Sequence, residues 1–112
     1  MRFILKFIIV SLAVYLVSKL LNGIYFRSAT SAFIFVAVLG LLNIFIKPLL
    51  VLFTIPITIL TLGLFLFVIN AVIVLIADAV IPGFDVANFW WALLFSIIVS
   101  VIYSITESLF ND

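Results

Sequence analysis

The sequence contains no cysteine and no histidine, and charged residues make up only 8% of its 112 positions. The chain therefore lacks a thiol nucleophile, the commonest transition-metal ligands and the usual general base near neutral pH. It also has no glycine-rich phosphate loop, no carboxylate pair and no nucleophile beside a base. We expect a protein that is not an enzyme and that holds neither a cofactor nor a metal.

Charge of either sign is scarce, because five Lys and Arg residues stand against four Asp and Glu residues, for a net charge of +1. Such a chain has no polybasic patch that would hold nucleic acid or an anionic surface. It has no long polar insertion that could form a domain for a soluble substrate. Residues 48–77 carry no charge at all, and neither do residues 28–46 and 86–106. Neither nucleic acid nor a soluble substrate is an expected partner.

The dominant feature is hydrophobicity, since 70% of the residues are hydrophobic and the mean hydropathy is +1.68. A chain of this size cannot bury that much apolar surface in a water-soluble domain. About 20 apolar residues in a helix cross a bilayer core about 30 Å thick. The alternation of apolar and polar residues that transmembrane strands require is missing. The sequence therefore predicts an all-α membrane protein with one integral membrane domain over residues 1–112.

Four transmembrane helices fit the hydrophobic pattern. The first is expected to end at Asn22 and Gly23, a helix-ending pair, and Asn88 is placed to cap the fourth. The expected spans cover residues 3–21, 32–53, 59–80 and 89–109.

Prolines divide the middle of the chain. We expect the second helix to be kinked at Lys47-Pro48, and a helical hairpin turn to lie near Pro56. A re-entrant hairpin over residues 47–63 is the alternative, because non-helical backbone at membrane depth is tolerated where protein shields it.

An even number of spans puts both termini on the same side of the membrane. With the termini inside, Arg2, Lys6 and a snorkelling Lys47 are cytoplasmic, against Lys19 and Arg27 outside. This bias favours cytoplasmic termini in a bacterial inner (cytoplasmic) membrane.

Polar residues at membrane depth are the candidates for a functional role. Asn43 and Lys47 share a face of the second span, and Asn70 lies on the third span at a depth similar to that of Asn43. An Asn43–Asn70 hydrogen bond is expected. Intramembrane amides act as packing contacts between helices. The alternative is a polar constriction in a solute pathway.

The fourth span carries small residues at every fourth position: Ala92, Ser96, Ser100, Ser104 and Ser108. Small residues at this spacing permit close contact between helices. A water-lined pore face is the alternative interpretation, and serine is compatible with both.

Aromatic residues gather where the fourth span begins. Because Trp is enriched at the headgroup level, we expect these residues to anchor the helix at the membrane interface. The anchors are Phe84, Phe89, Trp90 and Trp91.

Several short motifs resemble a known family. The matching pieces are the Asn-x-x-x-Lys-Pro motif at residues 43–48, the Thr-Leu-Gly motif at residues 61–63, the Val-Ile-Asn-Ala motif at residues 68–71 and the Pro-Gly-Phe motif at residues 82–84. In these pieces the chain resembles the bacterial four-span membrane proteins of the phage-holin-like superfamily. The resemblance implies a small inner-membrane protein and carries no functional residue with it.

Three functions follow from these observations. The leading hypothesis is a non-enzymatic membrane protein that self-associates through small-residue helix faces, or binds another membrane protein, in envelope organisation or stress. The second is a holin-like pore or permeabilising protein. The third is a small transporter or lipid-handling module that would use Asn43, Lys47 and Asn70.

Overall fold

The computed structural model describes residues 2–110 and is mostly helical. Its elements in chain order are α1 (Arg2–Ser18), β1 (Ile24–Phe26), α2 (Ala29–Phe45), α3 (Lys47–Phe53), α4 (Ile55–Leu60), α5 (Phe65–Val80), β2 (Phe84–Val86) and α6 (Phe89–Phe110).

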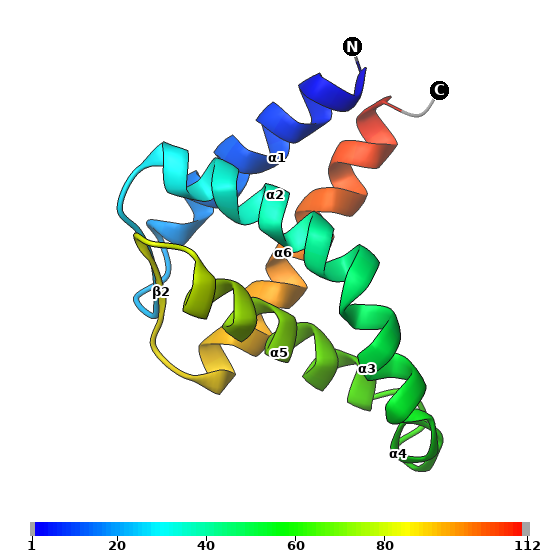
Figure 1. Cartoon of the computed structure of the whole chain (residues 1–112). Helices are drawn as coiled ribbons and strands as arrows, with labels where there is room; N and C mark the ends of the chain where they lie inside the picture. Colours follow the sequence, from blue (N-terminus) through cyan, green and yellow to red (C-terminus); the bar gives the residue numbers. More distant parts are fainter. Residues whose placement is uncertain (1, 111–112) are drawn as a thin grey trace.

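The four longer helices pack in a ring. Helix α1 contacts α2 and α6, and α5 contacts the same two helices from the other side (Figure 1). The short helices α3 and α4 form a tip that projects from the ring between α2 and α5. The helices are close together at the strand pair. Toward the other end α1 and α6 stay side by side, while α2 and α5 turn away from them (Figure 1).

Helix lengths set how far each element reaches. Helix α6 has 22 residues, about 33 Å at 1.5 Å per residue. Among the described helices it alone is long and apolar enough to cross a membrane by itself. Helices α2 and α3 meet the same criterion as a pair bent by 42°, and α5 is a shorter apolar helix of 16 residues.

The bend between α2 and α3 confirms the kink predicted at Lys47-Pro48. Helix α2 ends at Phe45, and Pro48 lies in the first turn of α3. Proline has no N–H for the helical ladder, and its ring collides with the carbonyl four residues earlier. The helix therefore breaks at Ile46 and resumes in a new direction.

The turn predicted near Pro56 is wrong in position. Pro56 lies in the first turn of α4, where a missing N–H is tolerated. The chain reverses later, at residues 61–64, where Leu62 and Gly63 adopt φ angles of 57° and 89°. The Gly63 N–H donates to the Thr58 carbonyl at 2.8 Å and so closes the end of α4. Residues 47–63 thus form two short helices divided at Thr54, with a glycine turn after them.

Two short strands correct the all-α prediction. Strands β1 and β2 lie in the α1–α2 and α5–α6 connections and pair antiparallel, with Tyr25 opposite Asp85. Two more backbone bonds extend the pairing: the Arg27 N–H donates to the Gly83 carbonyl at 2.6 Å, and the Ala87 N–H donates to the Gly23 carbonyl at 2.8 Å. The strand pair therefore joins two connections that are far apart in the sequence.

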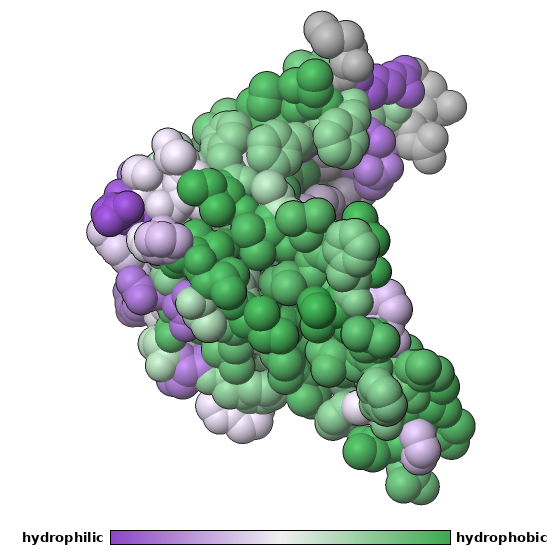
Figure 2. Space-filling view, viewed as in Figure 1, coloured by the Kyte–Doolittle hydropathy of each residue, from purple (hydrophilic) through white to green (hydrophobic). Residues whose placement is uncertain are grey.

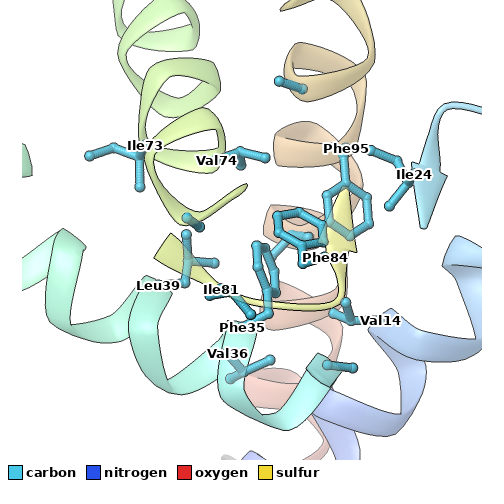
Figure 3. Close-up of a cluster of buried hydrophobic side chains, with 14 of the residues drawn as sticks. Val14, Ile24, Phe35, Val36, Leu39, Ile73, Val74, Ile81, Phe84 and Phe95 are labelled. Carbon is cyan, nitrogen blue, oxygen red and sulfur yellow. The ribbon is translucent and has the colours of Figure 1, made fainter. Parts of the chain in front are cut away.

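Beneath the strand pair lies a cluster of four buried phenylalanines. Figure 3 labels three of them, Phe35, Phe84 and Phe95. Phe26 of β1 stacks on Phe84 of β2 with ring centroids 4.6 Å apart, and Phe35 of α2 lies 4.8 Å from Phe84. Phe95 of α6 completes the cluster, 5.5 Å from Phe35. All four side chains are at most 5% exposed. We call this group the aromatic cluster. It holds one end of the helix ring closed.

The outer surface is hydrophobic over most of the molecule. Figure 2 shows hydrophilic residues gathered at the strand-pair end and beside the tips of α1 and α6, with a broad hydrophobic surface over α2, α3 and α4. Large apolar side chains are strongly exposed there, including Phe53 (79%) and Leu60 (83%). Exposed apolar surface of this extent is typical of a lipid-facing or partner-facing protein.

Replacing Gly23 should destabilise the strand-pair end. A Cβ atom at Gly23 would occupy the space of the Trp91 indole ring, whereas a Cβ at Gly40 in α2 meets nothing within 4 Å. We expect Gly23→Ala to lower the free energy of unfolding by about 1–3 kcal/mol, typical of overpacking. Gly40→Ala is the control, and alanine's higher helix propensity should leave it neutral or more stable. Thermal unfolding in detergent, followed by circular dichroism, measures both, and equal stabilities would contradict this packing.

Candidate functional site

A small polar cavity lies where the ring of helices begins to open. Its volume is about 70 Å³, and its lining comes from α2, the start of α3, α5 and α6. Its polar side chains are Asn43, Lys47, Asn70, Ser96, Ser100 and Tyr103. The structure therefore brings five of the six predicted polar candidates to one place.

Two apolar grooves adjoin the cavity. The first, about 440 Å³, shares Asn43 and Lys47 with the cavity and is otherwise lined by side chains of α3 and the start of α4: Pro48, Val51, Leu52 and Ile55. We call it the α3 groove. The second, about 240 Å³, shares Asn70 and Ser100 with the cavity and runs between α5 and α6. We call it the α5–α6 groove. Ser104, the sixth candidate, lines this second groove.

The serine hydroxyls are satisfied by their own helix. Ser96 Oγ donates to the Leu93 carbonyl at 2.8 Å, and Ser100 Oγ donates to the Ser96 carbonyl at 2.9 Å. Bonds to the preceding turn are the usual solution for serine within a helix. These two hydroxyls therefore need neither water nor a partner helix to satisfy their donors.

The amides and the ammonium group are not satisfied within the chain. Among residues 2–110, no hydrogen bond or ion pair is formed by the side chains of Asn43, Lys47, Asn70 or Tyr103. The Asn43–Asn70 hydrogen bond predicted from depth is not present, although both side chains line the cavity. All four side chains line the cavity.

Toward the strand pair the cavity is closed by buried apolar side chains. Leu39, Ile73 and Val74 line it and are at most 5% exposed. The same three residues belong to the hydrophobic core that contains the aromatic cluster (Figure 3). The polar cavity is thus a pocket that opens away from the strand pair, and the core separates it from that end.

Lys47 lies far along its helix from the strand pair. It is 18 residues beyond Ala29, about 27 Å at 1.5 Å per residue. Glu107 is likewise 18 residues beyond Phe89 in α6, and its carboxylate accepts a bond from Lys6 Nζ at 3.0 Å. Lys47 and the Lys6–Glu107 pair therefore stand at comparable distances from the strand pair.

The aromatic residues at the start of α6 divide into two groups. Trp90 is 72% exposed, and Phe89 meets it edge to face with ring centroids 5.4 Å apart. Trp91 is half-buried against Gly23. Phe84 differs from the expected interfacial anchor, because it is 1% exposed within the aromatic cluster. The alternation of β2 turns Phe84 inward and Asp85 outward.

The predicted cap of α6 is confirmed. Asn88 Oδ1 accepts a hydrogen bond from the Trp91 N–H at 3.0 Å, which is the geometry of an N-cap residue.

Tyr103 is the polar cavity residue that sequence reasoning missed. Helical spacing could have identified Tyr103, since positions 96, 100 and 103 share one face of a helix.

Fold and composition together define a small helical membrane protein with the strand pair β1–β2 at one end. The family model described as "Mycobacterial 4 TMS phage holin, superfamily IV" matches residues 1–105. The chain belongs to this family, a class of four-span membrane proteins, as its sequence motifs indicated.

Two relatives extend the comparison. The chain is 39% identical over 88 residues to "Uncharacterized membrane protein YvlD" of Bacillus subtilis, covering 78% of this chain and 74% of that protein. It is 41% identical over 98 residues to "Uncharacterized protein SCO3922" of Streptomyces coelicolor, covering 82% and 78%. No solved structure matches the chain. Family and relatives support a membrane location.

Cysteine labelling tests whether the cavity is hydrated. The chain has no native cysteine, so single substitutions report without background. Because a thiolate must form in water before it reacts, we expect Asn43→Cys and Ser100→Cys in liposomes to react with a small water-soluble maleimide. Ala92→Cys is the control in the same helix as Ser100 and is 0% exposed. Labelling of the cavity positions as slow as that of the control would show that the cavity is dry.

Proposed function

We propose that the chain crosses the membrane four times and self-associates through the α5–α6 groove, as a non-enzymatic protein of the bacterial envelope. In this arrangement α1, α2 with α3, α5 with α4, and α6 are the spans, close to the predicted residues 3–21, 32–53, 59–80 and 89–109. The four-span character of the family supports this arrangement.

The ends of the bundle support a common side for both termini. Arg2 donates to the Phe110 carbonyl at 2.8 Å, and Lys6 pairs with Glu107, so the start of α1 and the end of α6 lie together. Lys47 lies toward this same end. The positive-inside bias then makes this end cytoplasmic and places the strand pair on the outer side of the inner membrane.

The observation that carries self-association is the division of the serine face of α6. Ser96 is buried within the chain, whereas Ser100 and Ser104 are exposed in the α5–α6 groove beside Asn70. The Asn70 amide forms no hydrogen bond within residues 2–110, and an unpaired amide facing hydrocarbon is unfavourable. Small residues also allow another helix to approach closely. A second copy in this groove would cover the polar groups and use the half of the small-residue face that the monomer leaves open.

Cross-linking distinguishes the two halves of the face. We expect Ser100→Cys and Ser104→Cys to form intermolecular disulfides in membranes, because a symmetric contact at the groove can bring two copies of one position within the Cβ separation of about 4 Å that a disulfide needs. Ser96→Cys is the matched control, since its side chain is buried at 6% exposure. Non-reducing gels after mild oxidation give the readout. Monomers at all three positions, or equal cross-linking at position 96, would defeat this interface.

Family membership favours a second candidate, a holin-like permeabilising protein. The aromatic cluster closes one end of the bundle, so a lesion would form between copies and not through one copy. Controlled overproduction in a bacterial host, with a potential-sensitive dye, tests this candidate. If the protein permeabilises the membrane, overproduction of wild type should dissipate the membrane potential, and Ser104→Leu should dissipate it less. An unchanged potential at high expression of wild type would exclude this candidate. For the third candidate, a transporter using Asn43, Lys47 and Asn70, the cavity that these residues line is closed toward the strand pair by Leu39, Ile73 and Val74.

A further inference from the structure

Lys47 stands out among the lysines of the chain because no group of the described residues balances its charge. Lys6 pairs with Glu107 at 3.0 Å, and Lys19 lies 4.7 Å from the centre of the Tyr15 ring. Lys47 is half-buried and forms no ion pair within residues 2–110. A cation held partly out of water with no acidic neighbour is an unfavourable arrangement in an empty site.

The groups around Lys47 are hydrogen-bond donors. The cavity brings the amide groups of Asn43 and Asn70 and the Tyr103 hydroxyl to the same space, and its lining includes no carboxylate. Together with the ammonium group these side chains offer a charge and several donors to one ligand. That set is complementary to an anion rich in acceptor oxygens, such as a phosphate group.

The surroundings of the cavity favour a lipid as the source of the phosphate. A volume of about 70 Å³ is enough for about five waters at about 10–15 Å³ each, and so for a compact phosphate group. The α3 groove continues directly from Asn43 and Lys47 over Val51, Leu52 and Ile55. This groove offers an apolar surface for an acyl chain beside the charged cavity.

The position of Lys47 agrees with a headgroup. Lys47 begins α3 just after the bend at Ile46, in the cytoplasmic half of the second proposed span. In the proposed orientation its long side chain reaches toward the cytoplasmic headgroups, where anionic lipids are bound by basic pockets between helices.

We propose that the cavity binds the headgroup phosphate of an anionic phospholipid, with Lys47 Nζ as the charge partner and an acyl chain lying in the α3 groove. Asn43 and Asn70 donate to the phosphate oxygens, and the Tyr103 hydroxyl provides a further donor. The site shares Asn70 and Ser100 with the α5–α6 groove that the self-association proposal uses, whereas Ser104 lines that groove and not the cavity.

Native mass spectrometry of the detergent-solubilised full-length protein tests this site with phosphatidylglycerol, phosphatidylcholine and inorganic phosphate as probes. Wild type should retain phosphatidylglycerol in preference to phosphatidylcholine. Lys47→Gln should weaken phosphatidylglycerol binding about tenfold or more, as for loss of a charged hydrogen bond. Lys47→Arg should keep the preference. Lys19→Gln is the control, because it removes the same charge at the strand-pair end.

A second variant guards against a folding defect. Tyr103→Phe removes one hydroxyl and should weaken binding about two- to tenfold while helical content, followed by circular dichroism, stays unchanged. Equal retention of the two lipids by wild type, or unchanged binding in Lys47→Gln and Tyr103→Phe, would overturn the proposal. Displacement of phosphatidylglycerol by millimolar inorganic phosphate would assign the cavity to a soluble anion and would overturn the lipid source. Cross-linking at position 104 reports on self-association independently.

Discussion

The structure depends on the pairing of two interhelical connections above the aromatic cluster. Strands β1 and β2 join residues 60 positions apart in the sequence, from Tyr25 to Asp85, and the phenylalanines beneath them come from both strands and from α2 and α6. Stacked and tilted rings contribute more than their buried area alone. This contact fixes the four long helices at one end, and toward the other end α1 and α6 stay together while α2 and α5 turn away from them (Figure 1).

The divergence determines where polar groups can lie. Near the aromatic cluster the segments pack tightly, as the contact of Gly23 with Trp91 illustrates, and a polar side chain buried there is a small one, Ser31 beside Gly83. Farther along, Asn43, Asn70 and Lys47 have room around their polar atoms. The same geometry buries Ser96 and exposes Ser104 on one helix face. The surfaces proposed for self-association and for lipid binding both lie where the ring of helices changes from its closed half, near the strand pair, to its open half.

Sequence reasoning succeeded where one residue type has one strong local effect. Hydrophobic composition predicted the membrane class, Pro48 predicted the break between α2 and α3, and Asn88 predicted the cap of α6. Helical spacing and depth placed the polar candidates of the second and third spans near one another. The structure adds Ser96 and Ser100 of α6 to the same cavity, which the sequence did not predict. The Asn43–Asn70 bond did not follow, because depth fixes the level of a side chain along a helix but not its distance from a side chain on another helix.

The position of the turn after α4 was missed for a local reason, because Pro56 begins a short helix and the chain reverses at Gly63. The strand pair and the burial of Phe84 were missed because they depend on contacts between distant segments. Three-residue strands have too few positions to show a periodicity, and Phe84 is buried because β1 pairs with its strand. Amide hydrogen exchange of the full-length protein in lipid nanodiscs tests the pairing of β1 with β2 most directly. The account predicts that the Arg27 and Ala87 amides, which bond to the Gly83 and Gly23 carbonyls, exchange as slowly as the amides of neighbouring helices. Exchange as fast as that of an unstructured loop would contradict it.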